Sequence, residues 1–208
     1  MQKGRFVAID GIDGSGKGTQ IALLKRALGK KALFTHEPGG TPKAEKIRKI
    51  LLERKKERPS PIADFFLFWS ARADHIEKVI SPALRAGKNV ITDRFDSSTF
   101  AFQICAEKFP ELKSLFEECR KIVLSKCIPD AYIILDMPAP VARKWRSSNP
   151  VKRAVFFDKK SLAYYKRARS GFKRFAGIAD SKVFFVNANR PQERVRKEIW
   201  RIVSGILD

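Results

Sequence analysis

Short apolar runs alternate with longer segments of helical spacing along the whole chain. The apolar runs are rich in β-branched and aromatic residues, as in Phe6-Val7-Ala8-Ile9, and have the length of buried strands. They predict strands at residues 6–10, 32–35, 89–92, 131–135 and 183–186. Between them, helices are predicted at residues 17–28, 44–54, 61–85, 97–108, 111–125, 140–146, 159–176 and 191–206.

This alternation is typical of βαβ units. It predicts an α/β protein with a five-stranded parallel sheet flanked by helices. Neither an internal repeat nor a linker-like segment interrupts the pattern, so residues 1–208 are expected to form one domain. In such sheets, ligands bind beyond the carboxyl ends of the strands, which makes the residues after each strand the candidates for chemistry.

A glycine-rich loop follows the first predicted strand. Gly11, Gly16 and Lys17 match the pattern G-x-x-x-x-G-K, in which backbone amides and the lysine hold phosphates. Gly18 stands where a Ser or Thr usually binds Mg²⁺, and the next hydroxyl belongs to Thr19. A plain glycine turn is the alternative. The strand before the loop and the amphipathic helix after it favour a phosphate-binding loop.

Acidic and basic side chains follow the second and third strands. Glu37 lies in the turn His36-Glu37-Pro38-Gly39-Gly40-Thr41, where it could hold Mg²⁺ or its water shell, although such a turn is also common without a ligand. Asp93 and Arg94 follow the third strand. There a carboxylate can position Mg²⁺ and a guanidinium suits a phosphate, although an isolated Asp-Arg pair is often a simple salt bridge.

Three further positions have both a binding and a structural interpretation. Phe68 and Arg72 lie four residues apart on one helix face, where a ring and a guanidinium would suit a nucleobase, but the surrounding aromatic residues also read as core. Asp13 lies inside the glycine loop. It either faces a sugar hydroxyl or a metal, or it bonds its own turn.

Taken together, these residues resemble the thymidylate kinase family, P-loop enzymes that transfer a phosphoryl group from ATP to dTMP. The resemblance runs through residues 11–20, 37–41, 68–72, 93–103 and a later basic segment, and implies the P-loop kinase fold. The string Asp93-Arg94-Phe95-x-x-Ser98-Thr99-x-Ala101-Phe102 is the most specific part of it.

The resemblance implies a set of roles. Phe68 would stack on thymine, Phe102 would crowd a 2′-hydroxyl, and Asp13 would face the 3′-hydroxyl. The implied dTMP-binding residues are Asp13, Phe68, Arg72, Arg94, Ser98, Thr99, Phe102 and Gln103. The implied ATP-binding residues are Gly11, Gly14, Ser15, Gly16, Lys17, Gly18 and Thr19, with Asn189 and Arg190 near adenine. Mg²⁺ would be held by Thr19, Glu37 and Asp93.

Some enzymes of this family carry a catalytic arginine in the phosphate loop, and others supply it from a lid. Gly14 occupies the loop position here, so a helical lid at about residues 143–158 is expected to supply it. Arg143, Arg146 and Arg153 are the candidates, beside Lys17 and Arg94 as catalytic residues.

Three alternatives remain open at this point, one of which is a P-loop regulator that binds ATP without turnover. The loop Gly14-Ser15-Gly16-Lys17-Gly18-Thr19-Gln20 also resembles that of adenylate kinases, but their Asp-Gly-Phe-Pro-Arg string is absent after the third strand. The net charge of +21 also fits a nucleic-acid-binding protein with an inactive nucleotide site.

The remaining features bear on cellular context. Neither a signal peptide nor a membrane-spanning run is recognised, so a cytoplasmic location is expected. Cys105, Cys119 and Cys127 suggest reduced thiols and neither disulfides nor a zinc site. The family resemblance further implies a homodimer formed through the long third helix and its neighbour.

Overall fold

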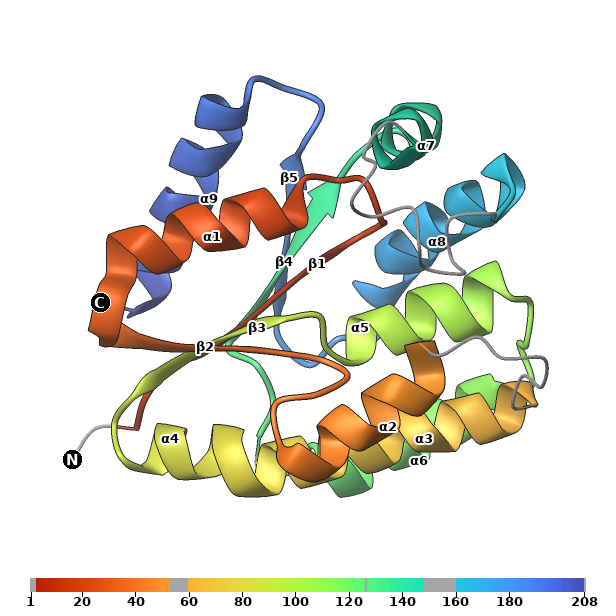
Figure 1. Cartoon of the computed structure of the whole chain (residues 1–208), viewed down its shortest axis with the longest axis horizontal. Coiled ribbons are helices and arrows are strands. Elements are labelled where there is room, and N and C mark those ends of the chain that lie inside the picture. Colours follow the sequence, from red (N-terminus) through yellow and green to blue (C-terminus); the bar gives the residue numbers. More distant parts are fainter. Residues whose placement is uncertain (1–2, 53–59, 126, 148–159, 208) are drawn as a thin grey trace.

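The computed structural model describes residues 3–52, 60–125, 127–147 and 160–207. Its centre is one parallel sheet of five strands in the order β2-β3-β1-β4-β5, which confirms the predicted fold class (Figure 1). The strands are β1 (Phe6–Gly11), β2 (Ala32–His36), β3 (Asn89–Asp93), β4 (Ala131–Asp136) and β5 (Lys182–Asn187). Every predicted strand is therefore confirmed, with ends that differ by at most one residue.

Helices cover both faces of this sheet. On one face lie α1 (Lys17–Leu28) and α9 (Gln192–Leu207), which contact each other (Figure 1). The other face is covered by α3 (Pro61–His75), α4 (Ser81–Arg85), α5 (Asp96–Ser98), α6 (Leu112–Val123) and α8 (Leu162–Phe175). Helix α2 (Pro42–Leu52) packs on α3, and α7 (Ala139–Ser147) packs on α8. A short 3₁₀ turn, η1 (Gly29–Lys31), leads from α1 into β2.

Two predicted helices contain π-helical turns. The helix predicted at 61–85 consists of α3, the π-helical turn η2 (Ile76–Ile80) and α4. Pro82 offers a physical reason, because it lacks an amide hydrogen and its ring crowds the carbonyl four residues earlier. The helix predicted at 97–108 is α5 followed by the π-helical η3 (Thr99–Ala106). Widened turns of this kind often occur at functional sites, and η3 carries several predicted binding residues.

The central strand β1 is completely enclosed, as expected for a sheet with helices on both faces. All six residues of β1 are buried, and the core continues into Phe65, Phe100, Phe116 and Phe175 of the covering helices. This packing fixes the carboxyl ends of β1, β2 and β3 at one edge, because His36 pairs with Asp93 and Ile9 pairs with Asp93 in the parallel register. The residues after these strands are thereby brought together. Among the described residues, no helix has the length and apolar composition needed to cross a membrane.

Candidate functional site

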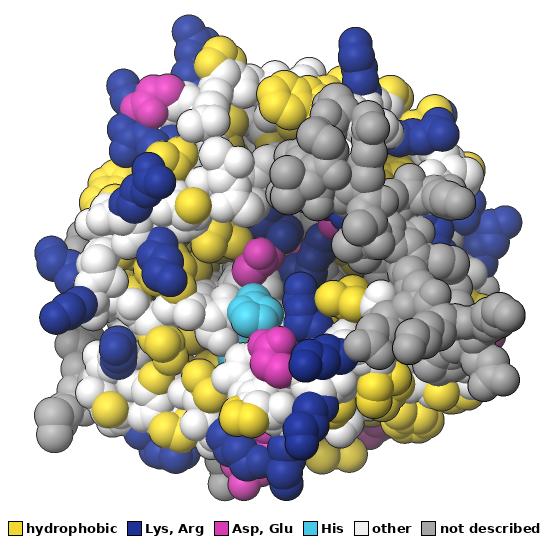
Figure 2. Space-filling model, viewed as in Figure 1, with side chains coloured by type: hydrophobic (Ala, Val, Ile, Leu, Met, Phe, Trp, Pro, Cys, Tyr) yellow, Lys and Arg dark blue, Asp and Glu magenta, His cyan; other side chains and the backbone are white. Residues whose placement is uncertain are grey.

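A cavity of about 960 Å³ lies at this edge of the sheet. Its lining comes from the glycine loop and α1, from the ends of β2 and β3, and from α3, η3, α7 and α8. Figure 2 shows basic side chains, acidic side chains and a histidine meeting in a hollow near the centre of the visible face. The volume falls within the range of small-molecule sites, and its polar groups come from segments far apart in the sequence.

The glycine loop has the backbone shape of a phosphate site. Gly14 and Gly16 have φ of 85° and 82°, a conformation that suits glycine, and α1 begins directly after Gly16. The first turn of α1 contains no acidic residue that would oppose an anion. Ser15 is buried, and its hydroxyl has no partner among the described residues. The loop can therefore direct amides and a hydroxyl at phosphate oxygens.

Gly14 also touches helix α7. A Cβ atom at this position would lie 2.0 Å from the carbonyl oxygen of Ala142. The loop and α7 therefore meet backbone to backbone, and a larger residue at position 14 would displace one of them.

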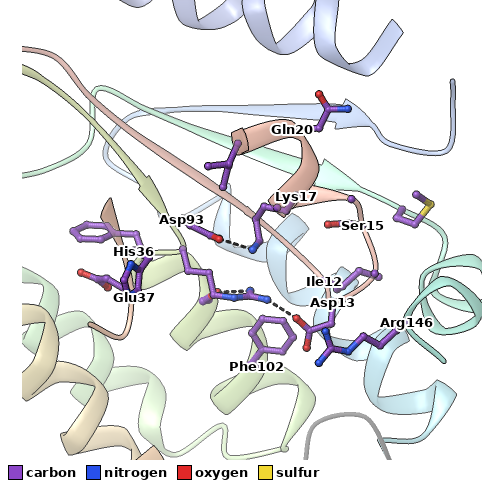
Figure 3. A pocket seen from close by; sticks show the side chains of 18 of the residues that line it. Ile12, Asp13, Ser15, Lys17, Gln20, His36, Glu37, Asp93, Phe102 and Arg146 are labelled. Carbon is purple, nitrogen blue, oxygen red and sulfur yellow. Dashed lines mark hydrogen bonds and ion pairs between the residues drawn. The ribbon is translucent and has the colours of Figure 1, made fainter. Parts of the chain in front are cut away.

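Lys17 and Asp93 form an ion pair across the base of the cavity (Figure 3). Burial lowers the pKa of Lys17, and the neighbouring Arg94 lowers it further. Burial alone would raise the pKa of Asp93, but the charges of Lys17 and Arg94 outweigh it and the pKa lies below its ordinary value. Asp93 is therefore ionised at neutral pH, as a magnesium ligand or a partner of Lys17 must be.

Arg94 lies between the glycine loop and η3, with a left-handed backbone (φ 70°). Its Nη1 donates to Asp10 Oδ1 at 3.1 Å and to Ser98 Oγ at 3.0 Å, and its Nη2 donates to Asp13 Oδ1 at 2.5 Å. Burial would lower the pKa of Arg94, but Asp13 and Asp10 reverse the effect and raise it. A permanently charged guanidinium is thus held at the wall of the cavity, next to the phosphate loop.

The far wall of the cavity holds Arg72, which is 2% exposed. Its Nε donates to Glu37 Oε2 at 2.8 Å and its Nη2 donates to Thr99 Oγ1 at 3.2 Å. Its Nη1 is buried without a partner among the described residues, as is Oε1 of Gln103 on the neighbouring η3. One donor and one acceptor are thereby left for a ligand.

Glu37, which was predicted to contact Mg²⁺, lies between two side chains of α3. Its side chain is 3% exposed, and the two carboxylate oxygens contact Arg72 and the ring of His75. Both oxygens therefore already have protein partners, and the contact of Glu37 with Mg²⁺ stays a prediction.

Aromatic side chains complete the same half of the cavity. Phe68 of α3 and Phe102 of η3 both line it. The Phe102 ring lies 5.1 Å from the Arg94 guanidinium and stacks on Tyr164 of α8 with ring centroids 6.2 Å apart. These surfaces suit a planar base and an adjoining sugar.

Most of the predicted residues line this one cavity. They are Asp13, Gly14, Ser15, Gly16, Lys17, Gly18, Thr19, Glu37, Phe68, Arg72, Asp93, Arg94, Ser98, Thr99, Phe102, Gln103, Arg146 and Arg190. Arg146 lies beside Asp13 and Phe102 (Figure 3). Three predicted residues, Gly11, Asn189 and Arg143, are outside the lining, although the Gly11 carbonyl accepts from Arg94 at 3.2 Å. Arg153, and all of the expected lid after residue 147, fall outside the described residues.

Sequence reasoning missed several residues of the site. Asp10 accepts a hydrogen bond from Arg94, and its position at the end of β1 could have suggested this role. Tyr164 and His75 carry no local signal, because helix packing brings them to the cavity lining and to Glu37, respectively.

Comparisons with known proteins agree with this geometry. The model of the thymidylate kinase family matches residues 9–199. A thymidylate kinase of Symbiobacterium thermophilum is 36% identical over 205 residues, which cover 97% of this chain and 94% of the relative. A thymidylate kinase of Chlamydia caviae is 37% identical over 192 residues, which cover 90% of this chain and 91% of the relative. The crystal structure of thymidylate kinase from Ehrlichia chaffeensis superposes with a TM-score of 0.76 at 26% identity, covering 97% of this chain and 99% of that one.

The family match extends over nearly all of the chain and includes both the glycine loop and the Arg72 side of the cavity, so it does not rest on the glycine loop alone. It therefore also decides against the adenylate-kinase interpretation of that loop. On these grounds the chain belongs to the thymidylate kinase family.

Proposed function

We propose that this protein transfers the γ-phosphoryl group of ATP to dTMP, giving ADP and dTDP. The observation that carries the proposal is the pair of unpartnered polar atoms on the Arg72 side of the cavity. Among the described residues, Arg72 Nη1 is a buried donor and Gln103 Oε1 a buried acceptor without a partner. Thymine presents the complementary pair, an acceptor at O4 and a donor at N3–H. Cytosine presents the opposite pattern at these positions and would leave both protein groups unsatisfied.

The reaction needs positioning more than proton transfer. An oxygen of the dTMP phosphate forms a bond to the γ-phosphorus, and the bond from that phosphorus to the bridging oxygen breaks to release ADP. The attacking phosphate is already largely anionic near neutral pH, so a strong general base is unnecessary. Lys17 and Arg94, on either side of the transferred group, would neutralise the charge that spreads over it.

Asp93 and Thr19 supply oxygen ligands of the kind that Mg²⁺ uses. No group of three or more metal-binding side chains is present among the described residues, and this fits an ion that is held mainly by phosphates, waters and one or two carboxylates. When bound with ATP, Mg²⁺ would neutralise phosphate charge. We assign Asp93 and the Thr19 hydroxyl to this ion, with Thr19 compensating for Gly18.

The lid is proposed at about residues 143–158, so that its first residues belong to α7. Within the described part, Arg146 lines the cavity and Arg143 does not, so Arg146 is our candidate for the lid arginine. Closure of a lid over the phosphates would also exclude water from the reaction.

A homodimer is proposed through α3 and the adjacent α6. Ile62 and Phe66 of α3 are about half exposed, and Ile122 of α6 is 74% exposed. Large apolar side chains on contacting helices are typical of protein interfaces. We further propose a cytoplasmic location, which suits ATP-dependent chemistry and the three free cysteines.

A coupled ADP-release assay tests the proposed function. dTMP, dUMP, AMP and CMP are supplied one at a time as acceptors, and dTMP is expected to give the highest kcat/KM. Strong preference for AMP would contradict the dTMP assignment, and absence of turnover with every acceptor would contradict the kinase assignment.

The nucleic-acid alternative has a separate test. Lys and Arg side chains are spread over the visible face in Figure 2 and do not form a single stripe. Salt-sensitive, tight binding of duplex DNA that persists in Lys17→Ala would revive this alternative.

A further inference from the structure

Glu37 is the centre of a buried polar cluster behind the proposed base site. It lies in the turn after β2, 4% exposed, between Arg72 and the fully buried His75. One carboxylate oxygen accepts from Arg72 Nε at 2.8 Å, and the other lies 3.1 Å from His75 Nδ1. The carboxylate thus joins two side chains that both belong to α3.

His75 connects this carboxylate back to the sheet. Its Nε2 lies 2.7 Å from the hydroxyl of Thr35 in β2. A neutral ring with its proton on Nδ1 satisfies both contacts, since Nδ1 then donates to Glu37 and Nε2 accepts from Thr35. A Cβ atom on Gly40 would lie 2.4 Å from the same ring, so the turn closes tightly over His75.

The cluster determines which part of Arg72 remains for a ligand. Nε is held by Glu37 and Nη2 by Thr99, while the guanidinium carbon lies 4.6 Å from the Trp69 ring centroid and 5.4 Å from that of Phe95. Held at two nitrogens and packed against two rings, the guanidinium has a fixed orientation. Only Nη1 is left without a partner among the described residues.

We infer that Glu37 and His75 are positioning residues for the acceptor base, which act by orienting Arg72. This inference rests on the proposed function, because it treats the Arg72 side of the cavity as the dTMP site. Binding of dTMP needs Arg72 in one orientation, and the cluster sets that orientation before the nucleotide arrives. The side chains of the cluster contact Arg72 in the acceptor half, so the variants should affect binding of dTMP more than binding of ATP or Mg²⁺.

Four variants test the inference. Glu37→Gln replaces one carboxylate oxygen by an NH₂ group, which cannot accept from Arg72 or His75. His75→Leu removes the ring nitrogens, whereas His75→Asn keeps an NH₂ donor near the position of Nδ1. Glu77→Gln is the matched control, because Glu77 is an exposed acid on the same helical segment.

The measurements are the dissociation constant of dTMP without ATP or Mg²⁺, by calorimetry, and the steady-state dependence on dTMP, ATP and Mg²⁺. Glu37→Gln is expected to weaken dTMP binding by about tenfold or more, the effect of losing a charge-assisted hydrogen bond. His75→Leu should weaken it in the same direction, and His75→Asn should restore most of the affinity. In all variants the KM for ATP and the Mg²⁺ dependence should match the wild type.

Three outcomes would overturn the inference. Unchanged dTMP affinity in Glu37→Gln with a higher Mg²⁺ requirement would make Glu37 a metal ligand. If a variant binds dTMP and ATP more weakly by the same factor and also melts at a lower temperature, the cluster is merely structural. The same conclusion follows if His75→Asn folds but does not restore dTMP affinity. A wild-type protein that does not bind dTMP would instead contradict the proposed function.

Discussion

The guanidinium of Arg94 lies 3.1 Å from the carboxylate of Asp10, at the end of the central strand. Asp10 is fully buried and also accepts from the hydroxyl groups of Ser97 and Ser98 and from the amide of Gly11. Burial raises the pKa of Asp10, although the charges of Arg94 and Lys17 and the hydrogen bonds from Ser97 and Gly11 oppose the effect. The phosphate loop and Arg94 are therefore fixed to the same buried carboxylate.

Asp10→Asn is expected to reduce kcat/KM for dTMP by about tenfold or more, because an amide group cannot accept all of these hydrogen bonds and leaves the buried charge of Arg94 less compensated. The coupled assay measures this loss. Ser97→Ala removes one donor that does not contact Arg94 and should have a smaller effect. Equal activity of Asp10→Asn and the wild type would show that Arg94 keeps its position without this carboxylate.

The Thr19 hydroxyl is predicted to compensate for Gly18 at the magnesium site. Thr19→Ala should raise the Mg²⁺ concentration needed for half-maximal activity, whereas Thr19→Ser, which keeps the hydroxyl, should not. Activity is measured against Mg²⁺ at saturating ATP and dTMP. If the two variants have the same Mg²⁺ dependence, the hydroxyl is not a ligand.

Arg146 and Arg143 form a matched pair on α7, since only Arg146 lines the cavity. If Arg146 acts on the transferred phosphoryl group, Arg146→Ala should lower kcat by roughly 10³-fold, the lower end of the contribution of an arginine finger. Arg143→Ala should leave kcat near that of the wild type. A larger loss in Arg143→Ala would transfer the role to that residue.

Gly14 is predicted to tolerate no side chain. In Gly14→Ala the Cβ atom would lie 2.0 Å from the Ala142 carbonyl in a left-handed backbone conformation, so α7 must move. We expect a destabilisation of about 2 kcal/mol in the free energy of unfolding, with lower kcat. Gly205→Ala is the control, because a Cβ there meets no atom within 4 Å. Similar denaturation midpoints for the two variants would argue against the close contact with α7.

Asp136 gives a prediction for the pH dependence of stability. Its two oxygens accept from Arg169 at 2.5 and 2.7 Å, and these hydrogen bonds lower the pKa of Asp136 below the ordinary value of 3.8. An acid with a lowered pKa in the folded state stabilises the protein above its unfolded pKa, and this stabilisation is lost as the pH falls through the folded value.

Thermal unfolding of Asp136→Asn and the wild type, followed between pH 7 and 3, measures this effect. The wild type should melt at a higher temperature at pH 7, and the difference between the two proteins should shrink as the pH falls below about 4. A difference that stays constant over this range would mean that ionisation of Asp136 does not contribute.

Local chemistry made much of the site predictable. The glycine loop, Asp93-Arg94 and the pair Phe68 and Arg72 are read from short strings, because glycine conformations, strand ends and helix periodicity depend on neighbouring residues. Glu37 shows what short strings do not reveal. Its turn predicted a metal ligand, which stays a prediction, whereas its side-chain partners Arg72 and His75 belong to a helix that begins more than twenty residues later.

The sequence by itself determined the alternation of strands and helices, the glycine loop and the family resemblance, since each depends on patterns along the chain. Only the tertiary structure decided the strand order, the attachment of Arg94 to Asp10 and the choice of Arg146 over Arg143 as the cavity residue. The physical reason is that these relationships arise when helices pack on the sheet. Packing selects which of many polar side chains are buried together, and burial then fixes their hydrogen bonds and their charges.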